Sequence, residues 1–188
     1  MLLAATPVFA QDATPPAAPP PAAAAPAGGQ VAGQKIVGVD VVGVLPLGDY
    51  SDASSFAIGA MARGEYVVND KLTATLRIGY LYHLGTPDGE SLYIIPIHVG
   101  ATYTLAPKIF AWAELGLDII GVSVDIGGVS GSTSDNKFGF AVGAGYEVAP
   151  KIKVRVGFYM PGSEDNADGS STTLYGIIGS VGYDFAAF

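Results

Sequence analysis

The sequence contains no cysteine, few charged residues and, among these, few basic ones. Without cysteine there is no disulfide scaffold and no thiolate metal site. Charged residues make up 14% of the chain, whereas an average soluble domain has about 25%. Nine basic residues stand against 17 acidic ones, which gives a net charge of −8. This balance excludes nucleic acid as an expected partner, because binding to phosphates needs a basic surface.

Long apolar runs are missing as well. After the N-terminus there is no stretch of about 18 consecutive apolar residues, so the sequence predicts no transmembrane helix. Hydrophobic residues nevertheless make up 49% of the chain, and the mean hydropathy is +0.40. An apolar excess without a helical span leaves two classes open, a soluble protein with a large β core and a membrane β-barrel.

The first 34 residues differ in composition from the rest of the chain. Residues 1–10 resemble the end of a secretory signal peptide, with an apolar run and small residues before a cleavage site that we place after Ala10. Residues 11–34 hold six of the 13 prolines and are otherwise mostly alanine, glycine and glutamine. Such a segment has no side chains with which to build a core, so we predict a disordered linker. Residues 35–188 form the expected folded domain.

That domain contains an internal repeat of about 40 residues. Residues 103–108 (YTLAPK) and 146–151 (YEVAPK) share a tyrosine, two variable residues and then Ala-Pro-Lys, and in both copies Gly-Ala and one further residue precede the tyrosine. Residues 64–68 and 182–185 share part of the pattern. The common unit is a strand that ends in Tyr-x-apolar, followed by a tight turn, so the repeat predicts a series of hairpins.

Between the turns, apolar and polar residues alternate with a period of two, which indicates strands and is incompatible with an amphipathic helix. The tight turns at 69–71, 106–108 and 149–151 alternate with longer connections at 48–53, 85–91, 127–137 and 161–172, an asymmetry typical of outer-membrane barrels. The predicted fold is therefore all-β, a closed eight-stranded antiparallel up-and-down transmembrane β-barrel. Its predicted strands are residues 36–47, 54–67, 72–84, 92–105, 109–126, 138–148, 152–160 and 173–186.

The two faces of these strands differ in charge. One face is apolar along the middle of every strand, and the other collects acidic and basic side chains together. Acids and bases in a small lumen can pair with one another, whereas Arg or Lys facing lipid near the midplane costs about 2–4 kcal/mol. We therefore assign the charged face to the barrel interior. The predicted lumen network comprises Asp40, Arg63, Glu65, Arg77, His83, His98, Glu114, Asp118, Glu147, Lys153, Arg155 and Asp184.

Aromatic residues mark the strand ends on the apolar face. Four tyrosines with outward parity lie at the turn end of alternate strands, where a ring places its body in lipid and its hydroxyl in water. A second group of aromatic residues lies at the loop end and comprises Tyr80, Tyr82, Tyr93, Phe158 and Tyr175. The predicted girdle at the turn end, which we expect to face the periplasm, comprises Tyr66, Tyr103, Tyr146, Tyr183 and Phe185.

With the Gly-x-Tyr-x-apolar strand ends, the Ala-Pro-Lys turns and an aromatic final strand, residues 35–188 resemble the small eight-stranded outer-membrane barrels of the OmpA/OmpX type. The resemblance implies a bacterial outer-membrane protein with both termini in the periplasm. The expected partners are outer-membrane lipid, lipopolysaccharide and the barrel assembly machinery, which recognises a C-terminal aromatic residue. Phe185 and Phe188 are both candidates for this signal, and the sequence leaves the choice open. The expected state is a monomer.

The sequence assigns no catalytic, cofactor-binding or metal-binding residue. His83 and His98 would lie near each other on paired strands, close to Glu114 or Asp118, as in a metal site or a general acid/base pair. We favour a lumen hydrogen-bond network instead. The predicted function is a non-enzymatic membrane anchor that presents surface loops, with a polar lumen filled by side chains. A narrow passive channel is the alternative, since Gly139, Ala141, Gly143 and Gly145 leave space on one strand.

Two further features concern the loops and one strand. The loops are acidic, which favours a solvated surface and leaves open a site for divalent cations or a basic partner. Pro96 lies inside a predicted strand with inward parity, where a missing donor predicts a bulge or a local gap. The acidic loop residues are Asp49, Asp52, Asp88, Glu90, Asp135, Glu164, Asp165 and Asp168, opposed only by Lys137.

Overall fold

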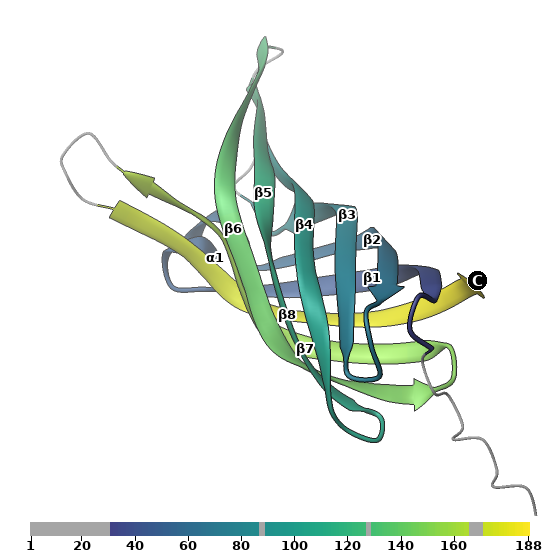
Figure 1. Ribbon diagram of the computed structural model, residues 1–188. Helices are drawn as coiled ribbons and strands as arrows, with labels where there is room; N and C mark the ends of the chain where they lie inside the picture. The colour runs from purple at the N-terminus through teal and green to yellow at the C-terminus, as the bar shows by residue number, and fades with distance from the viewer. Residues whose placement is uncertain (1–30, 87–88, 127–128, 166–170) are drawn as a thin grey trace, which may run out of the picture.

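The computed structural model describes residues 31–86, 89–126, 129–165 and 171–188 (Figure 1). The predicted signal remnant and residues 11–30 of the predicted linker lie outside the described residues. The described residues contain no helix that is both long and apolar enough to cross a membrane. The strands are β1 (Lys35–Leu47), β2 (Phe56–Val67), β3 (Leu72–Leu84), β4 (Glu90–Ala106), β5 (Ile109–Ile126), β6 (Val129–Ala149), β7 (Ile152–Asp165) and β8 (Ser171–Ala187), with a short helix α1 (Asp49–Ala53) between β1 and β2.

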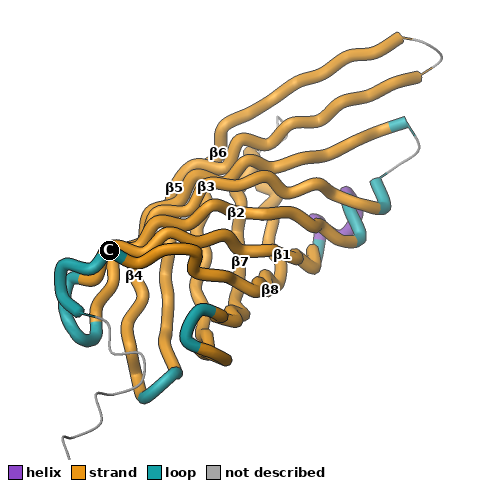
Figure 2. The backbone as a smooth tube through the Cα atoms, turned by 90° about the vertical axis from the view of Figure 1, so that its right-hand side faces the viewer, coloured by secondary structure: helices purple, strands orange, loops and turns teal. Residues whose placement is uncertain are grey.

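Each strand pairs antiparallel with its neighbours in sequence, and β1 also pairs with β8. This last pairing closes the sheet, so the predicted eight-stranded up-and-down barrel is confirmed (Figure 2). Closure gives every strand a hydrogen-bonded neighbour on both sides, so the barrel has no edge strand, as a β structure inside a bilayer requires. The turns β2–β3, β4–β5 and β6–β7 lie at one end, the turn end. The connections β1–β2, β3–β4, β5–β6 and β7–β8 lie at the other, the loop end.

The sequence repeat corresponds to a repeated turn structure. In each copy, the residue after the tyrosine donates its backbone N–H to a carbonyl. The acceptor is the residue immediately before the preceding strand, which is β1, β3, β5 or β7. Two register shifts also recur, between Thr104 and Ala106 and between Glu147 and Ala149, immediately before the two Ala-Pro-Lys turns. The repeated hydrogen bonds are Val67 to Gln34, Thr104 to Lys71, Glu147 to Lys108 and Asp184 to Lys151, at 2.8–2.9 Å.

Two strands are much longer than the sequence predicted. β6 begins at Val129 rather than at residue 138, and β7 continues to Asp165 rather than ending at residue 160. The β6–β7 pairing ends at Phe140 opposite Met160, whereas β5 stays paired with β6 up to Ile126 opposite Val129. Past the Phe140–Met160 pair the β5–β6 and β7–β8 hairpins diverge, and the β5–β6 hairpin protrudes furthest (Figures 1 and 2).

The predicted gap at Pro96 is confirmed. Pro96 is buried on the inward face and lies opposite Asp118 of β5 without a register shift. On its other side the β3–β4 ladder is interrupted between the pairs Ile78–Ile97 and Leu81–Ile94. Proline has no N–H to donate, so the interruption falls where the donor is missing.

Candidate functional site: the filled barrel lumen

All twelve predicted lumen residues occupy inward-facing strand positions, and eleven of them are buried. Glu147 is the exception. It lies near the turn end of β6, is half-buried and takes part in none of the ion pairs among the described residues. His83 is buried but likewise forms no ion pair in that part of the chain. The other ten predicted residues divide between two clusters along the barrel axis.

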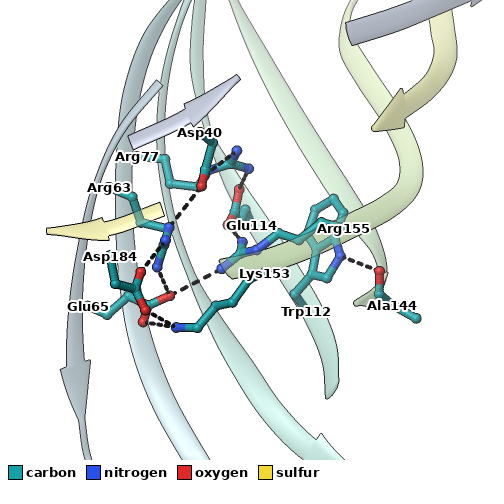
Figure 3. A network of polar contacts seen from close by, with 10 residues as sticks. All are labelled: Asp40, Arg63, Glu65, Arg77, Trp112, Glu114, Ala144, Lys153, Arg155 and Asp184. Carbon is teal, nitrogen blue, oxygen red and sulfur yellow. Dashed lines mark hydrogen bonds and ion pairs between the residues drawn. The ribbon is translucent and has the colours of Figure 1, made fainter. Parts of the chain in front are cut away.

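The larger cluster is a closed circuit of ion pairs that crosses the lumen (Figure 3). Asp40 of β1 contacts Arg63 Nε at 3.1 Å and Arg77 Nη2 at 2.8 Å. From Arg77 the circuit continues through Glu114 of β5, at 3.0 Å, and on to Arg155 of β7, at 2.9 Å. Arg155 and Arg63 both contact Oε1 of Glu65, which closes the circuit.

A second circuit shares the Arg63–Glu65 pair with the first. Lys153 Nζ lies 2.7 Å from Glu65 Oε2 and 3.3 Å from Asp184 Oδ2. Asp184 Oδ1 accepts a hydrogen bond of 2.6 Å from Arg63 Nη2. Glu65 and Arg63 therefore each contact three partners, and six of the eight strands are joined through side chains inside the barrel.

The charges of this network balance, because four carboxylates face three arginines and one lysine. Such balance is required, because an isolated buried charge costs several kcal/mol and only good pairing offsets that cost. Arg63 and Arg77 are each 1% exposed. Water therefore does not reach either guanidinium from the mouths of the barrel.

Aromatic side chains fill the remaining space at this level. The guanidinium of Arg155 lies over the rings of Phe110 and Trp112, with centroids at 5.6 and 5.8 Å. Trp112 Nε1 donates to the carbonyl oxygen of Ala144 at 3.1 Å (Figure 3). A Cβ placed on Gly143 would meet Trp112, and one on Gly145 would meet Phe110. The space that the glycines of β6 leave is thus occupied by rings from β5.

The smaller cluster lies nearer the loop end and centres on Asp118. His98 Nε2 is 3.1 Å from Asp118 Oδ2, and the Tyr159 hydroxyl donates to Asp118 Oδ1 at 2.7 Å. A Cβ on Gly139 would overlap the same carboxylate. The absence of a side chain at Gly139 therefore gives Asp118 its place in the lumen.

Helix α1 covers the lumen at the loop end, where the sequence predicted only a connection. Its Tyr50 is fully buried, and the Tyr50 hydroxyl lies 2.5 Å from His83 Nε2. Burial, with a smaller effect from Asp118, raises the pKa of Tyr50 well above its ordinary value. The Ser54 hydroxyl fixes the end of the helix by donating to the carbonyl of Leu84 at 3.0 Å.

An apolar layer separates Tyr50 from the two ion-pair circuits. It includes Val42, Val44, Met61, Leu81 and Ile94, each at most 2% exposed. From the turn end to the loop end, the described lumen thus consists of charged circuits, an apolar layer with the Asp118 cluster, and the Tyr50 cap.

The predicted proximity of the two histidines is wrong. In the β3–β4 register His98 lies opposite Arg77, whereas Leu81 and Tyr82, the residues before His83, pair with Ile94 and Tyr93. His98 therefore belongs to the Asp118 cluster, whereas His83 contacts Tyr50 of the cap. No group of three or more His, Cys, Asp or Glu side chains in the described ranges could hold a metal ion.

The acidic loop residues are distributed over separate elements. Asp49 and Asp52 lie in the first turn of α1, and Glu90 begins β4. Asp135 contacts Lys137 at 2.7 Å, and the hydrogen bond from Lys137 lowers the pKa of Asp135. Of the remaining predicted residues, Glu164 and Asp165 belong to the end of β7, while Asp88 and Asp168 lie outside the described residues.

The outer surface carries an apolar belt between two aromatic rows. The predicted turn-end tyrosines Tyr66, Tyr103, Tyr146 and Tyr183 are 44–49% exposed, and Phe185 is 58% exposed. On β5, Ala111 lies opposite Tyr103 and Gly121 lies opposite Tyr93, ten residues further on. Ten residues span about 33 Å along a strand, or about 25 Å of height at a tilt near 40°, the height of the apolar band of outer-membrane barrels.

Comparisons with known proteins agree with this geometry. A family model described as "Outer membrane protein beta-barrel domain" matches residues 1–185. Among solved structures, Ail of Yersinia pestis shares 11% identity at a TM-score of 0.62, covering 84% of this chain and 100% of Ail. The N-terminal β-barrel domain of Pseudomonas aeruginosa OprF shares 13% identity at a TM-score of 0.56, covering 83% of this chain and 100% of that domain. A search of curated proteins gives no significant match.

Proposed function

Because the chain belongs to the outer membrane protein β-barrel family, we propose that it is a non-enzymatic anchor and scaffold of the outer membrane. In this proposal the barrel holds the protein in the bilayer and presents the loop-end hairpins at the cell surface, in envelope integrity or surface interaction. The observation that carries the proposal is the double circuit of buried ion pairs across the lumen. A lumen filled in this way suits a structural element better than a conduit.

The proposed orientation places the turn end in the periplasm and the β5–β6 and β7–β8 hairpins outside. Short turns on the periplasmic side and long extensions on the outer side are the general arrangement of such barrels. A cysteine introduced at exposed Ser132 should then react with a membrane-impermeant maleimide on intact cells. A cysteine at Lys71 should react only after the outer membrane is permeabilised. The reverse pattern would overturn the orientation.

The remaining interactions in the proposal follow from this location. The apolar belt contacts the acyl chains of the outer membrane, and the acidic loop end faces lipopolysaccharide. The final strand β8 offers Phe185 or Phe188 to the assembly machinery, and the barrel acts as a monomer. Divalent cations between the acidic loop residues and lipopolysaccharide belong to the proposal as well. A calcium titration, in which the melting temperature is measured at each concentration, tests this cation binding. An unchanged melting temperature at millimolar calcium would rule it out.

The alternative function is a narrow passive channel for small solutes. Single-channel recording in planar bilayers separates the two functions. A filled lumen gives no stable conductance steps, whereas reproducible steps would favour the channel. A triple variant, Tyr50→Ala, Arg63→Ala and Arg155→Ala, tests whether the side chains block the lumen, because it removes the cap and two central cations. If this variant folds and conducts while the unsubstituted protein does not, the side chains are the plug.

A further inference from the structure

The described surface contains an open cavity of about 400 Å³ on the part of the sheet that extends past the loop-end aromatic row. This volume is at the lower end of the range of about 300–1,000 Å³ for small-molecule pockets. It is lined by β4, β5 and β6, and it lies outside the lumen clusters described above. Its lining includes four serines, Ser91, Ser123, Ser130 and Ser132.

Strand register places five of the lining side chains on the outward face of the barrel. Ser91, Ser123 and Ser132 form one cross-strand row, and Asp125 lies opposite Ser130 in the next outward row. Side chains alternate between the faces of a strand, so both rows point away from the barrel axis. The intervening row, Glu90–Val124–Gly131, points its side chains inward, so on the outward face it presents only its backbone. The four hydroxyls and one carboxylate thus converge on a single face.

An aromatic platform borders the serine row. Tyr93 lies in the adjacent outward row, opposite Gly121, and a Cβ on Gly121 would overlap the hydroxyl end of the Tyr93 ring. The ring therefore leans across β5 over the glycine, and it stacks on Tyr80 with centroids 5.5 Å apart. The Tyr93 ring can occupy this space because Gly121 has no side chain.

These groups suit a sugar ring. Aromatic residues with a few placed polar groups are typical of small-molecule pockets, and hydroxyl and carboxylate groups can bond to the hydroxyls of a sugar. The described lining contains no lysine or arginine, and anion recognition relies on such cations. We propose that this surface, the serine face, binds an uncharged pyranose unit.

The position of the serine face identifies the source of the sugar as a neighbouring membrane glycolipid. The face looks sideways from the barrel, and it starts two residues beyond the Tyr93 row that bounds the apolar belt. Two residues span about 7 Å along a strand. A group at that height lies just above the acyl chains, where the saccharide headgroup of an outer-leaflet glycolipid begins. This inference depends on the outer-membrane location in the proposed function, whereas a soluble glycan would approach from the loop tips.

The test uses the full chain in nanodiscs, titrated with a rough lipopolysaccharide that carries only a short core saccharide. Binding is followed through the NMR signals of the Ser91, Ser123 and Ser132 amides. The expected result is a saturable shift of these signals that persists in EDTA. The triple substitution Ser91→Ala, Ser123→Ala and Ser132→Ala should weaken binding at least tenfold, because it removes three hydroxyls that can each bond to the sugar.

Two single substitutions complete the test. Gly121→Ala leaves every serine in place but displaces the Tyr93 ring, and it should also weaken binding at least tenfold. Thr133→Ala removes a hydroxyl from the inward face of the same hairpin, opposite Val122, and should leave binding unchanged. Heat-modifiable gel mobility confirms that each variant is folded.

The results that overturn the inference are distinct from failure of the proposed function. Absence of binding, equal binding by the triple variant, or loss of binding in EDTA would each overturn it, the last because a cation would then bridge to phosphate. Equal affinity for the free core saccharide would identify a soluble glycan instead. A protein that does not insert into nanodiscs at all would refute the proposed function, and this is scored before any titration.

Discussion

Arg63 Nη2 donates a 2.6 Å hydrogen bond to Asp184 Oδ1, although the two residues are 121 positions apart in the chain. Arg63 lies on β2 and Asp184 on β8, and β1 runs between these strands. The contact therefore spans the seam at which the barrel closes. It can form only after β8 has paired with β1, so the side-chain network reports barrel closure.

Arg63→Met should destabilise the barrel by about 3–5 kcal/mol, since it leaves Asp40, Glu65 and Asp184 without their shared cation. The free energy of unfolding in urea, measured in lipid vesicles, checks this value. Asp135→Asn breaks an exposed ion pair and should leave the stability almost unchanged, because water and salt screen the pair. Adding Asp184→Asn to Arg63→Met should recover part of the loss. Unchanged stability of Arg63→Met would contradict the role of the network.

Tyr50→Phe should cost about 1–3 kcal/mol, because buried His83 loses the hydroxyl partner of its Nε2. The same unfolding measurement applies. Ser51→Ala, which removes an exposed hydroxyl from the same helix, should change stability by less than about 0.5 kcal/mol. Equal effects of the two substitutions would show that the Tyr50–His83 contact contributes nothing.

Alkaline pH should weaken the barrel through Tyr50. Its pKa is raised by burial, so the folded protein keeps a proton that the unfolded chain releases above about pH 10. This contribution is fully present below pH 10 and decreases as the pH rises further. Unfolding titrations between pH 9 and 11 should show a steeper decline for the unsubstituted protein than for Tyr50→Phe. Parallel curves would refute the assignment.

Gly139→Ala should destabilise by about 1–3 kcal/mol, the usual cost of an added methyl group in a packed interior. Its Cβ would overlap the Asp118 carboxylate and lie 2.9 Å from the carbonyl oxygen of Met160. The matched control is Gly64→Ala on the outer face, where a Cβ meets nothing within 4 Å. That change should be neutral or stabilise by about 0.5–1 kcal/mol, because alanine loses less conformational freedom in a strand. A free channel beside Gly139 would make both substitutions harmless.

Leu115→Arg should cost about 2–4 kcal/mol in vesicles, because Leu115 lies midway between the aromatic rows and faces outward. Val148→Arg, beyond the turn-end tyrosines, should cost only about 0–1 kcal/mol. Both side chains are about half exposed, at 51% and 53%, so the comparison isolates depth. Equal costs at the two positions would contradict the placement of the apolar belt.

Most of the correct prediction of the fold and of the lumen followed from strand parity. Period-two alternation assigns Arg63, Glu65 and Arg155 to one face without any knowledge of their partners. The partners depend on shear and register across a closed barrel, which residue spacing does not specify. For this reason the circuits through Glu65 and Asp40 were not foreseen, and the two histidines were wrongly placed together.

Composition misled the prediction where strands leave the membrane. Residues 130–136 are polar and rich in serine, as in a loop, yet they pair with β5 residue by residue. Outside the bilayer a paired strand needs no apolar face, so its alternation disappears. Helix α1 has five residues, too few for a helical period, and its Tyr50 is recognisable only by its burial.

Lys35 and Phe188 exchange two backbone hydrogen bonds of 2.8 and 3.0 Å. The first and last residues of the barrel are therefore direct neighbours, and the cylinder has no intrinsic starting strand. A circular permutant that joins residue 188 to residue 31 through a short linker, and opens the chain at the Asn69–Lys71 turn, would keep all eight strand pairings. It would, however, end on β2 instead of β8. Such a molecule separates the architecture of the barrel from the order in which its strands follow one another along the chain.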